Sequence, residues 1–172
     1  MEIPVIVEKI KTGTSEFIQD QHELMERNLG EPLLSGKLFG YFEPLFPEFN
    51  VDPEYNGDID KPNDRKALDI ARNRIEDVKK EVNDKNKYYL KPDIIIHIRG
   101  TNKNNLAVIE VKKDNSDPNK VRYDEIKLEH LTINYLGNHY NYKIGVLIIL
   151  GTGKNTGKVD YRMYVEGLPY IA

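Results

Sequence analysis

The segment that decides the fold occupies residues 91–113 and reads KPDIIIHIRGTNKNNLAVIEVKK. It contains two apolar runs of strand length, and the polar residues between them include the Gly and Asn that hairpin turns favour. We therefore predict two antiparallel strands, at 93–98 and 106–112. Charged residues stand at the start of the first strand and near the end of the second. Charges are costly in the core of a sheet, so these ends are either solvated or part of a site.

Three of these charged residues would meet at one corner of the hairpin. Residues two apart on a strand point to the same face, so Glu110 and Lys112 project together while Val111 points away. If the start of the first strand lies opposite the end of the second, Asp93 joins them. Two carboxylates at that distance repel each other unless a divalent cation lies between them, and hard oxygen ligands suit Mg²⁺ or Mn²⁺. The pattern therefore indicates a metal site in which Lys112 can orient a metal-activated water.

The tripeptide acid-any-lysine is weak evidence by itself, because it occurs four times in this highly charged chain. Three copies lie in predicted helices, where the two charges mostly face water. Only the copy at 110–112 lies on a strand that follows another strand headed by Pro92-Asp93. Taken singly, Asp93 is explained as a turn residue, and Glu110 with Lys112 as a surface ion pair worth little. Taken together, these residues favour a site.

Pro92-Asp93, a hydrophobic strand and then Glu110-Val111-Lys112 resembles the motif of the PD-(D/E)xK nuclease superfamily, whose fold is called restriction-endonuclease-like. The longer stretches YFEPLFPEFNVDPEYN and PDIIIHIRGTNKNNLAVIEVKK are similar to uncharacterised bacterial members, and the likeness covers about residues 31–150. The resemblance implies a central mixed β-sheet flanked by helices. It also implies a metal-dependent nuclease that hydrolyses phosphodiester bonds of nucleic acid, with DNA as the expected substrate.

Carried over by motif, the resemblance makes Asp93, Glu110 and Lys112 the catalytic residues. Asp93 and Glu110 would hold Mg²⁺ or Mn²⁺, helped by the carbonyl oxygen of Val111. Lys112 would position the attacking water or help to deprotonate it.

The resemblance further implies a third metal ligand from an acidic residue on an upstream helix. By order along the chain Glu31 matches best, with Glu23 and Glu26 as rivals. Pro32 stands where the family pattern has a basic residue, which weakens the match at that point. The alternative role for Glu31 is stabilisation of a helix start, typically worth about 0.3–1 kcal/mol.

Three more residues are candidates for contact with the substrate. His97 and Arg99 alternate with Asp93 along the first strand, so they would share its face and could contact phosphate. A structural role for His97 is equally compatible with the pattern. Lys127, on the helix predicted to follow the hairpin, could also contact a phosphate, although a solvated helix face is the commoner reason for such a lysine.

The rest of the sequence supplies an α/β set of elements around the hairpin. Apolar residues three and four apart predict helices, and the amphipathic segment 62–82 would be a helical insertion between the first two core strands. Pro53 confines its strand to a sheet edge or a bulge. The almost wholly apolar run at 143–150 is typical of a strand covered on both faces. In all we predict helices at 14–29, 31–46, 62–82 and 123–136 and further strands at 48–55, 143–150 and 161–165.

Length and composition favour one folded domain, 1–172. The chain has 172 residues, of which 39% are hydrophobic and 31% charged, with no cysteine, as in soluble globular proteins. No apolar run approaches the roughly 20 residues needed to span a bilayer, and no secretory signal is evident, so we expect no membrane partner and a cytoplasmic location. The net charge of -3 means that a nucleic-acid-binding face would have to be local.

Two other motifs fail on spacing. The run GTGKNTGK at 151–158 lacks the four residues that a phosphate loop needs between its first Gly and Gly-Lys, so we predict a hairpin loop. Four scattered histidines and no cysteine argue against a structural zinc site.

The alternative to a nuclease is a catalytically inactive nuclease-like module that binds nucleic acid or protein. A homodimer, or a partner within a defence or mobile-element system, is compatible with both the nuclease and the binding module. The sequence does not distinguish between these partners.

Overall fold

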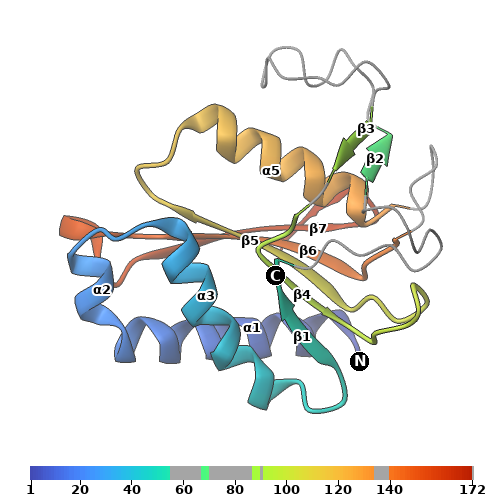
Figure 1. Cartoon of the computed structure of the whole chain (residues 1–172), viewed down its shortest axis with the longest axis horizontal. Helices are drawn as coiled ribbons and strands as arrows, with labels where there is room; N and C mark the ends of the chain where they lie inside the picture. Colours follow the sequence, from blue (N-terminus) through green and yellow to red (C-terminus); the bar gives the residue numbers. More distant parts are fainter. Residues whose placement is uncertain (55–66, 70–86, 90, 134–139, 172) are drawn as a thin grey trace.

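The computed structural model is built around a mixed six-stranded sheet with helices on both faces (Figure 1). This confirms the predicted α/β architecture with a central mixed sheet flanked by helices. The residues that the structure describes are 1–54, 67–69, 87–89, 91–133 and 140–171.

The strand order in the main sheet is β1-β4-β5-β6-β7-β8. Strands β5 and β6 run parallel, and every other neighbouring pair is antiparallel. Strand β1 lies at an edge, where the proline at its end removes no hydrogen bond from a second neighbour. The bounds are β1 Asn50–Pro53, β4 Ile94–His97, β5 Ala107–Lys113, β6 Ile144–Leu150, β7 Val159–Val165 and β8 Leu168–Tyr170.

The hairpin predicted within residues 91–113 is confirmed, because β4 and β5 pair antiparallel. The GTGKNTGK run also joins two antiparallel strands, β6 and β7, through a short 3-10 turn at Gly153–Asn155. Both connections are therefore hairpin loops.

Helices α1 (Ile3–Asp20), α2 (His22–Glu26) and α3 (Glu31–Phe42) lie on one side of the sheet, and α5 (Pro118–Leu131) lies on the other (Figure 1). Alternation along β5 divides the core between them. Ile109 and Val111 pack in the cluster that contains the apolar side chains of α1 and α3, whereas Val108 packs with those of α5. A central strand that is apolar on both faces is thus covered on both.

Two helices begin earlier than predicted. Helix α1 begins at Ile3 with a proline in its first turn, so Thr14 lies inside the helix, where its hydroxyl donates to the Ile10 carbonyl at 2.8 Å. Helix α5 begins at Pro118, and the Asp117 side chain caps it by accepting from the Asn119 N–H at 2.9 Å. In both cases a proline occupies the first turn of the helix, where its missing N–H costs nothing.

The predicted helix at 62–82 is wrong at Ala67–Asp69, which form strand β2. This strand pairs antiparallel with β3 (Lys87–Tyr89) in a separate two-stranded sheet. Apolar spacing within one segment carries no information about such a distant pairing partner. The remainder of that segment, and the end of the helix predicted at 123–136, lie outside the described residues.

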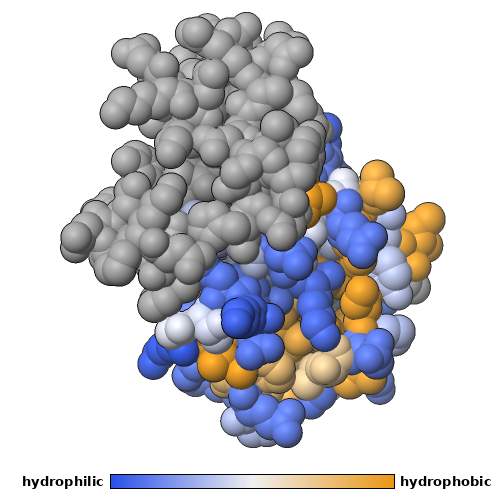
Figure 2. All heavy atoms as spheres, turned by 90° about the vertical axis from the view of Figure 1, so that its right-hand side faces the viewer, coloured by the Kyte–Doolittle hydropathy of each residue, from blue (hydrophilic) through white to orange (hydrophobic). Residues whose placement is uncertain are grey.

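The described surface is mixed in character. Figure 2 turns the right-hand side of Figure 1 toward the viewer and shows hydrophilic and hydrophobic side chains interspersed over the described part of that face. Such mixing is ordinary for a folded domain. Among the described residues, no helix is both long enough and apolar enough to cross a membrane.

Candidate active site

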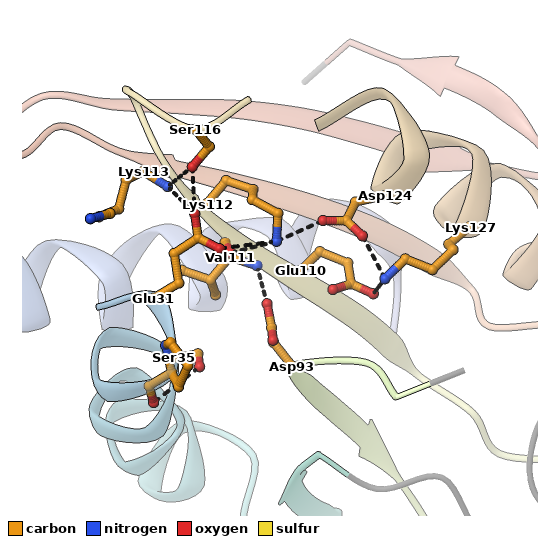
Figure 3. A network of polar contacts seen from close by, with 11 residues as sticks. Glu31, Ser35, Asp93, Glu110, Val111, Lys112, Lys113, Ser116, Asp124 and Lys127 are labelled. Atoms are coloured by element: carbon orange, nitrogen blue, oxygen red, sulfur yellow. Dashed lines mark hydrogen bonds and ion pairs between the residues drawn. The ribbon is translucent and has the colours of Figure 1, made fainter. Parts of the chain in front are cut away.

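Asp93 and Glu110 face each other at one end of the hairpin. The β4–β5 register pairs Ile94 with Ile109, and its continuation by one residue places Asp93 opposite Glu110. Directly opposed residues have Cβ atoms about 4.5–5.5 Å apart. Figure 3 shows both side chains between the start of α3 and the α5 helix. The predicted meeting of these two carboxylates is therefore present.

Asp93 is fixed by the strand that it faces. Its Oδ2 accepts a hydrogen bond from the Val111 N–H at 2.7 Å. Burial raises the pKa of Asp93, and the Val111 hydrogen bond and the positive charges of Lys112 and Lys127 only partly oppose this rise. Asp93 therefore holds its negative charge at a cost, which a nearby cation would relieve.

Glu110 is more deeply buried, with 2% of its surface exposed. Its Oε1 accepts a hydrogen bond from Lys127 Nζ at 2.7 Å. Burial raises the pKa of Glu110 to about 8, with repulsion from Asp124 and Asp93 acting in the same direction and Lys127 against it. Lys127 therefore offsets only part of the cost of keeping this buried carboxylate ionised.

Lys112 lies beside two carboxylates. Its Nζ is 2.7 Å from Asp124 Oδ2 and 3.4 Å from Glu31 Oε2, and it donates to the Val111 carbonyl at 3.3 Å. Burial acts to lower the pKa of Lys112, but the carboxylates of Asp124, Glu110 and Asp93 outweigh it, so the pKa lies above its ordinary value. In this cluster the Lys112 ammonium is therefore held as a hydrogen-bond donor to its neighbours.

Glu31 reaches this cluster from the first residue of α3. Besides Lys112, its carboxylate accepts hydrogen bonds from the Ser116 hydroxyl and, at 3.5 Å, from the Lys113 N–H. These contacts join the start of α3 to the end of β5 and the turn after it (Figure 3).

The rival acids lie elsewhere on the surface. Glu23 pairs with Arg27 at 2.6 Å and Glu26 with His22 at 3.7 Å, and all four side chains are exposed. Of the three candidates for the helix-borne acid, the structure brings only Glu31 next to Lys112.

Asp124 is the site residue that the sequence reading missed. It is 4% exposed, and its carboxylate bridges the two buried lysines, with Oδ1 2.5 Å from Lys127 Nζ and Oδ2 2.7 Å from Lys112 Nζ. The available signal was helical spacing, since 124, 127, 128 and 131 fall on one face of a helix whose apolar members point to the sheet.

Lys127 lies on the same inward face and is 8% exposed. The expectation of a solvated helix face for Lys127 is therefore wrong. Its ammonium is held between Glu110 and Asp124, and those carboxylates keep its pKa above the ordinary value although burial acts to lower it.

The residues present fit a divalent cation by charge and by donor type. Four carboxylates and two ammonium groups make up the cluster, so two negative charges are in excess when all are ionised. The Val111 N–H occupies Oδ2 of Asp93, and Lys127 occupies Oε1 of Glu110. The second oxygen of each carboxylate accepts no hydrogen bond from the described residues. With the Val111 carbonyl, these are hard oxygen donors of the kind Mg²⁺ takes. No three Asp, Glu, His or Cys side chains within the described ranges are grouped closely enough to hold a metal.

His97 and Arg99 do not join the cluster. Both contact Asp52 of β1, through His97 Nε2 at 2.8 Å and Arg99 Nε at 2.8 Å. They share the face of Asp93 but lie at the other end of β4, where four residues of strand span about 13 Å. The structure therefore separates these two predicted substrate contacts from the carboxylates.

The contacts of Asp52 lead to a prediction about stability. Asp52→Asn should lower the free energy of unfolding at pH 7 by about 1.5–3 kcal/mol, because it removes hydrogen bonds to charged partners. The hydrogen bond from Arg99, opposed by burial and assisted by His97, lowers the pKa of Asp52 below its ordinary 3.8. The stabilisation is thus complete above pH 4 and is lost as the pH falls through the lowered pKa.

Urea unfolding of both proteins at pH 7 and at pH 3 measures this dependence. The difference in unfolding free energy between wild type and Asp52→Asn should be smaller at pH 3 than at pH 7. The control Glu54→Gln, which changes an exposed residue next to the strand, should unfold like wild type at both pH values. A difference that grows on acidification would contradict the assignment.

Comparison of the chain with protein-family models, with curated proteins and with solved structures found no match in any of the three. The fold and the site together define an α/β protein with a buried carboxylate–lysine cluster at one end of a mixed sheet. Its function has to be inferred from that geometry.

Proposed function

We propose that the protein is a metal-dependent nuclease of the PD-(D/E)xK type, with a restriction-endonuclease-like fold, that hydrolyses phosphodiester bonds in DNA. One observation carries the proposal. Asp93 and Glu110 are opposed on neighbouring strands, Lys112 follows Glu110 on the same face, and Glu31 reaches Lys112 from the helix upstream. That is the arrangement that the motif resemblance implies.

Asp93, Glu110 and the Val111 carbonyl would hold the cation, Mg²⁺ or Mn²⁺. When bound, the cation would supply Lewis-acid stabilisation of the phosphate and a water of lowered pKa. Lys112 would position the attacking water or help to deprotonate it, and its ammonium could also donate a hydrogen bond to a phosphate oxygen. Asp124 and Glu31 hold the Lys112 ammonium in place from two sides.

Glu31 has contacts that bear on its role. Its two oxygens already interact with Ser116 and Lys112, so direct ligation of the cation would require it to give up one of them. Positioning of Lys112 is the role that keeps both contacts.

The test is cleavage of supercoiled plasmid, linear duplex, single-stranded DNA and RNA with Mg²⁺, with Mn²⁺ and with a chelator. Wild type should cut DNA only when the metal is present, and Lys112→Ala should lose most of this activity. Lys113→Ala is the matched control, because the neighbouring lysine points to Asn28 and not to the cluster. Equal cleavage by wild type and Lys112→Ala would contradict the mechanism.

A catalytically inactive binding module is the second candidate, and one observation favours it. Glu110 is already ion-paired with Lys127, and Lys112 with Asp124, so both residues have partners within the protein. This candidate predicts nucleic-acid or protein binding that needs no metal and survives Asp93→Ala. Calorimetric Mg²⁺ binding that disappears in Asp93→Ala would count against it.

A further inference from the structure

Lys127 places its positive charge against one oxygen of the carboxylate that the proposed cation would need. The Lys127 Nζ lies 2.7 Å from Glu110 Oε1 and 5.3 Å from the centre of the Tyr123 ring. Glu110 itself is only 2% exposed. The ammonium therefore sits where a second positive charge near Glu110 would be repelled. It also satisfies a carboxylate that would otherwise be buried without a counter-charge.

Asp124 offers the same ammonium a second anionic partner. Its Oδ1 is 2.5 Å from Lys127 Nζ, on the side away from Glu110 (Figure 3). If the bond to Glu110 breaks, Lys127 keeps Asp124 and the face of Tyr123, so no buried charge is left unpaired. A cation could thus replace Lys127 at Glu110 without local unfolding.

Lys112 differs from Lys127 in this respect. Its carboxylate partners are Asp124 and Glu31, and it makes no hydrogen bond or ion pair with Glu110 among the described contacts. Of the two buried lysines, Lys127 is the one whose charge would compete with a cation at Glu110.

We infer that Lys127 is an internal counter-cation of Glu110, which a divalent cation displaces on binding while Asp124 retains the released ammonium. The inference rests on the proposed cation site. It assigns α5 a role in setting the affinity of that site, and it explains how the buried carboxylates can fold together without metal.

The experiment is a calorimetric titration of Mg²⁺ and Mn²⁺ into wild type, Lys127→Met, Lys127→Arg and Lys113→Met at pH 8, with circular dichroism as the check on folding. Lys127→Met removes the charge with little change in length and should bind the cation about ten- to a hundredfold more tightly, the equivalent of one charge-assisted hydrogen bond. Lys127→Arg keeps the charge and should bind the cation no more tightly than wild type. Lys113→Met removes a charge outside the cluster and should bind like wild type.

A second comparison confirms which site is measured. Adding Asp93→Asn to Lys127→Met should abolish the tighter binding. If Lys127→Met does not fold, Lys127→Gln takes its place with the same expectation, and the cation-induced rise of Tm, larger than in wild type, gives an independent readout.

The outcomes separate the inference from the proposed function. Equal or weaker cation binding by Lys127→Met and Lys127→Gln, with binding by wild type intact, overturns the role of Lys127 and leaves the nuclease proposal standing. Absence of cation binding in wild type and in all variants overturns both.

Discussion

Asp93→Asn is expected to abolish Mg²⁺ binding and to reduce DNA cleavage by about a hundredfold or more, the scale on which a single electrostatic contact to a transition state acts. The substitution is nearly isosteric. The Asn carbonyl can still accept the Val111 N–H bond that Asp93 Oδ2 accepts at 2.7 Å, so the hairpin should keep its geometry. What is lost is one negative charge of the pair that faces the proposed cation.

Calorimetry for the metal and plasmid cleavage for the activity measure this effect. Asp160→Asn is the control, because it removes an exposed carboxylate from β7 without touching the cluster. Undiminished metal binding by Asp93→Asn would show that the opposed carboxylates are not the cation site.

Asp124→Asn should have the largest effect on stability. We expect the free energy of unfolding to fall by about 3–5 kcal/mol, because Asp124 is the carboxylate that both buried lysines share and breaking a buried ion-pair network is strongly destabilising. Asp124 is bonded to two buried lysines, and after the change Lys112 retains only Glu31 and Lys127 only Glu110 as anionic partners.

Glu129→Gln is the matched control on the same helix. Glu129 pairs with the half-exposed Arg122, and such a pair is worth about 0–1 kcal/mol. Urea unfolding at pH 7 compares the two variants. Losses of similar size would mean that Asp124 contributes no more than a surface charge.

The local part of the structure could be read from the sequence. Two apolar runs and a Gly- and Asn-containing turn were enough for β4 and β5, and alternation along β5 was enough to bring Glu110 and Lys112 to one face. Their meeting with Asp93 followed from the antiparallel register. These features depend on residues close in the chain, where periodicity is informative.

The part that depends on tertiary packing could not be read in the same way. Asp124 and Lys127 became site residues only because α5 turns that face onto the end of β5, and charges on a predicted helix normally point to water. Likewise, alternation correctly placed His97 on the face of Asp93, but the length of β4 carries it away to Asp52. The alternation of side chains along a strand predicts which face a residue occupies but not how far along the strand it lies.

The pairing of Glu110 with Lys127 also limits how this protein can diverge. Replacing Lys127 alone leaves the buried Glu110 without its ion-pair partner, whereas replacing both residues with apolar ones leaves a packed and neutral contact. Among descendants of one ancestor, positions 110 and 127 should therefore be exchanged jointly or not at all. A lineage that lost the proposed cation site would show it first as this coupled double replacement, with the surrounding fold inherited intact.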